Sequence, residues 1–190
     1  MRVLLLSPNT ESLNMPVNPV GMHLVADAVR ADGHQVMTLD MALYEHPWTV
    51  IEQKIRQFSP DLTGVSIRNI DDQSMQDTQF LLKGSREVLR RLRGITSAPI
   101  VVGGAGYSIF PQSGLSYLQA DMGLAGEGET ALPALLQAMQ GQRREDTVPG
   151  LYRPQVGRVG PVHFVPNLDI CPLPRADWLD TSRSLRRNFW

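Results

Sequence analysis

The 190-residue sequence contains a single cysteine, Cys171. One cysteine cannot build an internal disulfide framework. It also cannot by itself supply a four-cysteine zinc site or hold an iron–sulfur cluster. Such sparse use of cysteine is typical of proteins in a reducing compartment, so we expect a cytoplasmic location.

The chain also lacks a charge surplus and long apolar runs. Its net charge of -1 gives no indication of a nucleic-acid or membrane partner. No apolar run approaches the length of a membrane span. The first run, Arg2 to Leu6, stops at Ser7-Pro8. It is too short for a signal peptide and predicts a strand instead.

Five short apolar runs alternate with segments of helical periodicity, which predicts a parallel, doubly wound α/β sheet. The predicted strands are Arg2–Leu6, Gln35–Leu39, Leu62–Ile67, Ile100–Val102 and Met122–Ala125. The predicted helices cover 20–32, 51–58 and 76–92, a short segment around Leu115 and Leu118, and 132–139. Right-handed crossovers and short connections favour the flavodoxin-like (Rossmann-like) strand order 2-1-3-4-5.

The composition changes after Met139, where a polar and charged stretch begins. We therefore predict one α/β domain over residues 1–140 and a linker over 141–190. Within the linker, Gly150–Arg153 and Pro161–Val165 flank a Gly157-Arg158 turn and indicate a small hairpin. Residues 177–190 have a pattern compatible with a helix. The aromatic C-terminus leads us to expect that the chain is the excised part of a longer protein.

Polar or glycine-rich loops follow four of the predicted strands. They begin at Ser7, Ser66, Gly103 and Gly126. Any one of them is explained by the turns that such sheets require. Four on the same edge favour a shared ligand site, because ligands bind outside the carboxyl ends of parallel strands. A dinucleotide or nucleoside triphosphate is disfavoured, since no Gly-x-Gly-x-x-Gly follows the first strand and no Gly-Lys-Ser/Thr loop occurs.

The order of motifs resembles the N-terminal cobalamin-binding domain of cobalamin-dependent radical S-adenosylmethionine (SAM) enzymes. The resemblance covers residues 1 to about 140, and its tail resembles the linker that precedes the radical domain. Its more specific strings are Ser66-Ile67-Arg68-Asn69-Ile70-Asp71 and Gly103-Gly104-Ala105-Gly106-Tyr107-Ser108. The more generic matching pieces are Val3–Pro8, Pro19–Leu24, Gly33–Val36, Pro60–Val65 and Gly126–Glu129.

The resemblance implies a bound cobalamin whose nucleotide tail lies between the third and fourth strand ends, with the corrin ring over the sheet edge. The residues expected to contact the cofactor are Asn9, Ser66, Ile67, Arg68, Asn69, Gly103, Gly104, Ala105, Gly106, Tyr107, Gly126, Glu127 and Gly128. Some have structural alternatives. Arg68 and Asn69 either bind the corrin amides or fasten their own loop, and Tyr107 either packs on the cofactor or covers the sheet edge.

Two motifs of the related families do not occur in this sequence. The Asp-x-His-x-x-Gly loop, whose histidine ligates cobalt in the wider cobalamin-binding family, is missing. We therefore expect base-off cobalamin, with no metal ligand from His23, His34, His46 or His163. The Cys-x-x-x-Cys-x-x-Cys motif that holds the radical family's [4Fe–4S] cluster is missing too. Residues 1–190 therefore cannot cleave SAM, and SAM and the cluster would belong to a radical SAM domain beyond residue 190 or in a partner protein.

We accordingly predict a cobalamin-carrying domain of a radical methyltransferase-type enzyme, with no catalytic residue of its own. One alternative is a free-standing cobalamin sensor or carrier. Another is a hydrolase or transferase that uses Ser66 or Glu127. A catalytic role for Glu127 and Glu129 is the minority interpretation, because a carboxylate at a helix start is favoured by the helix dipole. Asp71 and Asp72 are expected to cap the helix that follows them.

Overall fold

A computed structural model describes residues 1–10, 18–72, 75–161 and 167. The strands are β1 (Arg2–Ser7), β2 (Gln35–Asp40), β3 (Leu62–Ser66), β4 (Ile100–Gly103), β5 (Met122–Leu124), β6 (Leu151–Arg153) and β7 (Gly157–Arg158). The α-helices are α1 (Val20–Ala31), α2 (Pro47–Phe58), α3 (Leu82–Arg93), α4 (Ala105–Ile109), α5 (Pro111–Leu118) and α6 (Gly128–Met139). Short 3₁₀ turns occupy Met41–Leu43 and Glu145–Thr147.

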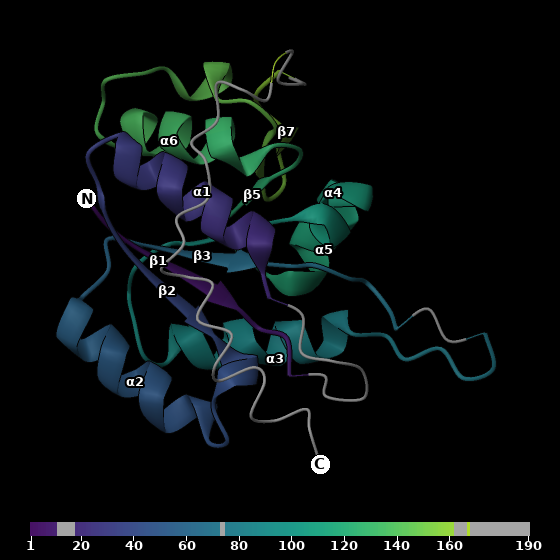
Figure 1. The fold of residues 1–190 in the computed structure, drawn as a ribbon. Coiled ribbons are helices and arrows are strands. Elements are labelled where there is room, and N and C mark those ends of the chain that lie inside the picture. The colour runs from purple at the N-terminus through teal and green to yellow at the C-terminus, as the bar shows by residue number, and fades with distance from the viewer. Residues whose placement is uncertain (11–17, 73–74, 162–166, 168–190) are drawn as a thin grey trace.

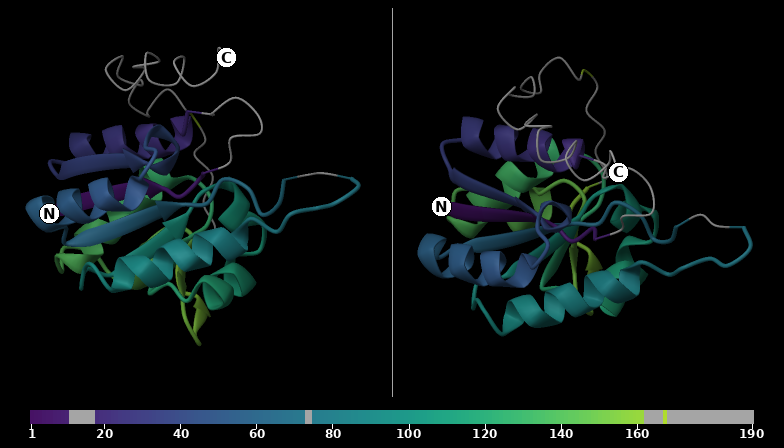
Figure 2. Two further views of the ribbon diagram at one scale, coloured as in Figure 1. Left: turned by 90° about the horizontal axis from the view of Figure 1, so that it is seen from below. Right: turned by 60° about the horizontal axis from the view of Figure 1, so that its bottom comes forward.

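The strands form one seven-stranded sheet in the order β2-β1-β3-β4-β5-β6-β7. The first five strands in the chain are parallel, so the predicted order 2-1-3-4-5 and the doubly wound α/β class are confirmed. The sheet lies between α1 and α6 on one face and α2 and α3 on the other (Figures 1 and 2). This layering buries both faces, which explains the continuous apolar runs of the parallel strands.

Side chains alternate along each strand between two separate cores. In β1, Leu4 and Leu6 pack into the core under α2, α3 and α5, whereas Val3 and Leu5 pack into the core under α1 and α6. The same alternation in the other parallel strands follows from the two-residue period of a strand. Every second residue at the carboxyl end of a strand therefore faces the α1/α6 layer.

The C-terminal hairpin is confirmed, but its second strand differs from the prediction. Strand β6 pairs antiparallel with β5, and β7 pairs with β6, so the hairpin extends the sheet. Its second strand is Gly157–Arg158, the segment predicted as the turn, because Pro154 and Gln155 already reverse the chain; Gln155 has a φ of 66°. The described residues do not include 162–165 (with His163), Cys171 or the helix predicted over 177–190. The domain boundary at residue 140 stays a prediction.

Helix α3 begins at Leu82, six residues later than predicted. The preceding residues instead form an arm that leaves the body of the domain beyond β3 (Figure 1). The arm is closed at its base by a bridge between Asp71 and Phe80. The Asp72 carboxylate accepts a 3.0 Å hydrogen bond from the Gln79 amide, so Asp72 fastens the arm and does not cap α3 as predicted.

Tyr107 occupies the core under α5, and its side chain is 2% exposed. Its hydroxyl has no hydrogen-bond partner among the described residues, and burial is the first cause that raises the pKa of this phenol, followed by nearby Tyr152. The ring is accommodated because position 123 of β5 is glycine. A Cβ there would lie 1.9 Å from the Tyr107 hydroxyl.

The Tyr107 packing can be tested by two substitutions. Tyr107→Phe removes a buried hydroxyl that has no partner, so the unfolding free energy is expected to rise by about 1 kcal/mol or to stay unchanged. Gly123→Ala forces a Cβ onto that side chain and is expected to lower the unfolding free energy by about 1–3 kcal/mol. Urea unfolding followed by circular dichroism measures both. A large loss of stability in Tyr107→Phe would show that the hydroxyl is bonded.

Candidate functional site

A cavity of about 470 Å³ opens at the carboxyl edge of the sheet. Its floor is the sheet face that packs under α1 and α6, and those two helices form its walls. The strands contribute Leu5, Ser7, Gly64, Val65, Ser66, Val101, Val102, Gly103 and Leu124. The remaining lining residues are Asn9, Asn18, Pro19, Val20, Gly21, Met22, Val25, Arg68, Gly104, Ala105, Gly126, Gly128, Glu129 and Leu132. A cavity of this size is within the usual range for a small-molecule site.

The floor is hollow because two adjacent central strands carry glycine where a side chain would face the cavity. Gly64 of β3 pairs in register with Leu5 of β1 and with Val101 of β4. Two residues closer to the carboxyl edge, Ser66 pairs with Gly103, and Gly103 pairs with Leu124. The sheet surface therefore dips between larger neighbours, and its shape follows from strand register and alternation.

The helix walls approach each other closely. Gly128, the first residue of α6, lies against Val25 of α1, and a Cβ on that glycine would be 2.7 Å from the valine Cγ2 atom. Both helices begin at the carboxyl edge of the sheet, so their first turns border the mouth of the cavity. Among the residues that the structure describes, no side-chain hydrogen bond caps the first turn of either helix. Helix α1 has no acidic residue in that turn, whereas α6 has Glu129.

Hydrogen bonds hold the loops around the mouth. Backbone N–H groups at Ile67 and Gly106 donate to the Gly103 and Ile67 carbonyls at 2.7 and 3.0 Å, which joins the β3 and β4 ends. Ser108 links the loop that follows β4 to the loop that follows β5. Its hydroxyl donates to the Gly104 carbonyl at 2.9 Å and accepts from the Gly126 amide at 3.0 Å.

Gly104 lines the cavity, but its lack of a side chain allows the loops to pack together and does not enlarge the cavity. It has φ 100° and ψ 173°, a conformation that only glycine adopts without strain. A Cβ on Gly104 would lie 2.6 Å from the Ile67 carbonyl oxygen. A side chain at position 104 would therefore point at the end of β3 and not into the cavity.

The structure brings together eight of the predicted site residues at the cavity: Asn9, Ser66, Arg68, Gly103, Gly104, Ala105, Gly126 and Gly128. The other five, Ile67, Asn69, Gly106, Tyr107 and Glu127, lie outside its lining. Ile67 and Tyr107 belong to the core on the opposite face of the sheet. Gly106 is buried, with the Arg68 carbonyl 2.9 Å from where its Cβ would be.

Sequence reasoning missed the floor and the α1 wall. Gly64 gave a usable signal, because glycine inside a buried strand indicates a close approach by another group. Val25 and Leu132 gave none, since an apolar residue on a helix looks the same in a cavity wall as in a packed core. Residues 18–22 line the cavity because α1 begins at its mouth, and the sequence does not show where a helix begins relative to a cavity.

A buried carboxyl group adjoins the cavity at the end of β2. Asp40 pairs in register with Ser7, one of the lining residues, and hydrogen-bonds with its hydroxyl. Burial raises the pKa of Asp40, while the hydrogen bonds from Ser7 and the Ala42 amide act in the opposite direction. The Asp40 side chain therefore constrains the Ser7 hydroxyl at the cavity wall.

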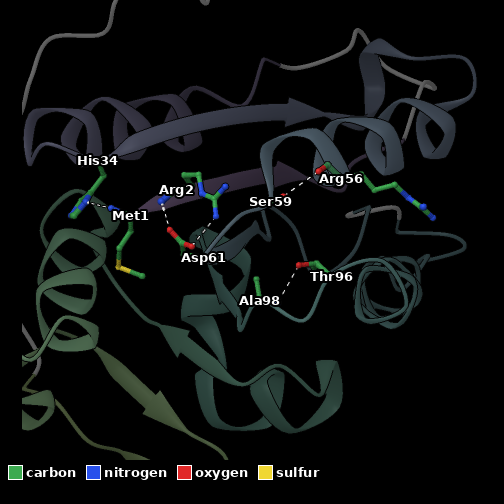
Figure 3. A network of polar contacts seen from close by, with 8 residues as sticks. All are labelled: Met1, Arg2, His34, Arg56, Ser59, Asp61, Thr96 and Ala98. Carbon is green, nitrogen blue, oxygen red and sulfur yellow. Dashed lines mark hydrogen bonds and ion pairs between the residues drawn. The ribbon is translucent and has the colours of Figure 1, made fainter.

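The histidines that the structure describes lie outside the cavity lining. His34 sits at the amino edge of the sheet, where its Nδ1 atom is 3.1 Å from the Met1 amino group (Figure 3). The same edge is fastened by the Asp61 carboxylate, which accepts a 2.7 Å bond from the Arg2 amide (Figure 3). That backbone bond is the main cause that lowers the Asp61 pKa.

Among the described residues, no group of three or more His, Cys, Asp or Glu side chains is arranged to hold a metal ion.

The helices in the described part of the chain are all too short or too polar to cross a membrane.

Comparison with known proteins gives a consistent set of relatives. Residues 7–136 match the family model described as the B12 binding domain. Tryptophan 2-C-methyltransferase from Streptomyces laurentii is 29% identical over 152 residues, which are 78% of this chain and 25% of that protein. An uncharacterized methyltransferase from Pyrococcus horikoshii is 26% identical over 188 residues, 94% of this chain and 39% of that protein. The chain thus spans well under half the length of these relatives.

Solved structures show the same relationship. The radical SAM methyltransferase TsrM from Kitasatospora setae, solved with cobalamin and a [4Fe–4S] cluster bound, superimposes with a TM-score of 0.76 and 30% identity. The match covers 84% of this chain and 31% of TsrM. The cobalamin-dependent radical SAM enzyme OxsB, with aqua-cobalamin and SAM bound, gives a TM-score of 0.71 at 17% identity, covering 98% of this chain and 25% of OxsB. This second match shows the shared fold.

The role assigned to Gly104 gives a stability prediction. Gly104→Ala is expected to lower the unfolding free energy by more than about 2 kcal/mol, because it adds backbone strain and a contact with Ile67. Gly84→Ala is the matched control. Gly84 lies on an exposed position of α3 with open space around it, so alanine there should raise the unfolding free energy by about 0.5–1 kcal/mol. Equal stability of wild type and Gly104→Ala in urea unfolding would contradict the loop-packing role.

Proposed function

Because the chain belongs to the B12-binding domain family, we propose that it holds cobalamin base-off and positions it for a radical SAM enzyme of methyltransferase type. The nucleotide tail would occupy the cavity, and the corrin ring would lie over the carboxyl edge of the sheet. The observation that carries this proposal is the hollow at Gly64 and Gly103 on the floor of the cavity.

The cavity residues fit the tail of cobalamin. A flat aromatic base needs an apolar slot between the sheet and the helices, and Leu5, Val101 and Leu132 line such a slot. The ribose and phosphate need polar partners farther out, where Ser7 and Asn18 lie. The first turn of α1 also borders this mouth, and the amino-terminal end of a helix favours a negatively charged group.

The corrin ring carries amide side chains around its rim, and the polar residues of the loops suit them. Asn9 and Arg68 line the mouth, and exposed Asn69 follows Arg68 on the same loop. In this proposal these three residues orient the ring by hydrogen bonds. When bound, cobalamin supplies the cobalt centre that carries a methyl group, and this chain supplies placement.

The position of the cavity supports the base-off arrangement. A base held on the Gly64 floor is separated from cobalt, since it lies inside the domain while the ring lies at the edge. The described histidines His23, His34 and His46 are not among the lining residues. We therefore propose that none of them takes the place of the base on cobalt.

The proposed partner is a radical SAM domain, in the same polypeptide or in a separate chain. It would supply the [4Fe–4S] cluster and the SAM site. The partner is expected to pack over the carboxyl edge, where the corrin ring would face it. Ile109 and Phe110 follow the glycine loop at this edge and are 61% and 62% exposed, which suits them to contact another domain.

Cobalamin retention tests the proposal. The purified chain is mixed with hydroxocobalamin, freed of unbound ligand by gel filtration and examined by visible spectroscopy. We expect the corrin absorbance to co-elute with the protein. After reduction to cob(II)alamin, the electron paramagnetic resonance lines should lack the splitting that a nitrogen on cobalt produces. Failure to retain corrin would contradict cobalamin binding, and nitrogen splitting would contradict the base-off arrangement.

A substitution on the floor locates the tail. Gly64→Ala would place a Cβ 2.6 Å from the Leu5 Cδ2 atom, so that the leucine must move and the floor of the slot rises. We expect cobalamin affinity to fall at least about tenfold, as measured by absorbance titration. The exposed Gly84→Ala variant should bind like wild type. Unchanged affinity in Gly64→Ala would place the tail elsewhere.

A further inference from the structure

The cavity is divided into an apolar floor and a polar mouth. Across the floor, Leu5, Gly64 and Val101 stand side by side on three neighbouring strands. Leu124 of β5 extends this apolar floor, and the apolar side chains of Met22, Val25 and Leu132 on α1 and α6 lie opposite it and form the roof. The polar side chains of the lining are Ser7, Asn9, Asn18, Ser66, Arg68 and Glu129. All six belong to strand ends, to loops or to the first turn of a helix.

The backbone polar groups of the floor are already hydrogen-bonded within the sheet. Leu5, Gly64 and Val101 lie within the parallel β1–β3 and β3–β4 ladders, where their N–H and C=O groups serve the sheet. A ligand group that reaches the floor therefore meets neither a polar side chain of the described lining nor a free backbone group. Polar side chains begin two residues farther along β3, at Ser66.

Building on the proposed function, we propose that this cavity selects cobamides by their lower base, accepting benzimidazole and discriminating against purines. Once attached to its ribose, dimethylbenzimidazole has one free ring nitrogen, and its other edge carries methyl groups. That single nitrogen can be met by Ser66 while the methyl edge rests on Leu5, Val101 and Leu132. The hydroxyl of Ser7, held by Asp40, lies beside this boundary.

A purine base does not suit the same slot. Adenine carries three ring nitrogens that accept hydrogen bonds and an exocyclic amine with two donors. In any orientation within the slot, at least one of these groups faces the hydrocarbon floor or roof after losing its water. Each buried polar group left without a partner is expected to weaken binding by about tenfold or more. The apolar floor thus acts against purinyl cobamides as well as in favour of benzimidazole.

The wild-type chain provides the direct test. Dissociation constants are measured by absorbance titration for hydroxocobalamin and for its analogue with adenine as lower base. Free cobalamin must first release its base from cobalt, and the adenine analogue releases its base more readily. The equilibrium constant between the base-on and base-off forms of each free cobamide is therefore measured by a spectral pH titration. The measured affinity is then corrected for this constant.

We expect the corrected affinity for cobalamin to exceed that for the adenine cobamide at least about tenfold. Equal corrected affinities, or tighter binding of the adenine cobamide, would overturn the selectivity while leaving cobalamin binding intact. If neither cobamide binds, the proposed function itself fails, and the selectivity with it. The two failures are therefore distinguishable without any variant.

A hydroxyl placed on the floor should relax the selectivity. Val101→Thr puts a donor and acceptor beside Gly64 at nearly constant volume, and we expect the affinity ratio to fall several-fold through tighter binding of the adenine cobamide. Val3→Thr is the matched control: Val3 is buried on the same face of the sheet but is not among the lining residues. Its ratio should equal that of wild type. A ratio in Val101→Thr that matches Val3→Thr, with both variants folded, would contradict the role of the floor.

Discussion

The structure depends on one packing constraint: a parallel sheet buried on both faces must have each of its surfaces filled. Along β1, β3, β4 and β5, every second side chain faces α1 and α6, and the others fill the opposite core. Gly64 and Gly103 stand on the α1/α6 face and line the cavity, and Leu5 leans toward Gly64 because no side chain stands there. The site is thus a consequence of side-chain size at particular register positions.

Other glycines keep the surroundings of this cavity closed. Gly104 and Gly106 let the β4–α4 loop lie directly on the backbone of the β3 end, and Gly128 lets α6 approach Val25 of α1. Ser108 then ties the β4 and β5 loops together. Backbone packing and hydrogen bonds thus join the loops that follow β3, β4 and β5 at the mouth of the cavity.

Much of this arrangement could be predicted from the sequence, because it follows from local patterns. The apolar runs and their spacing gave the parallel strands and their order, and the polar strand ends gave the edge at which the cavity lies. The α1 wall was not predictable in this way, since Val25 looks like any core residue. Nor was the place of Tyr107, which depends on Gly123 of another strand. The prediction extends the helix back to residue 76 from the periodicity of the residues that follow. The bridge between Asp71 and Phe80, which a local pattern does not reveal, instead makes residues 76–80 part of the arm.

The central claim is that the floor over Gly64 receives the nucleotide tail of cobalamin. A crystal structure of the chain with hydroxocobalamin bound tests this most directly. The account predicts density for the benzimidazole between the sheet and the α1–α6 pair, in contact with Leu5, Gly64 and Val101, and a corrin ring at the carboxyl edge. A base still coordinated to cobalt, or a corrin bound on any other face with the cavity free of it, would contradict the account.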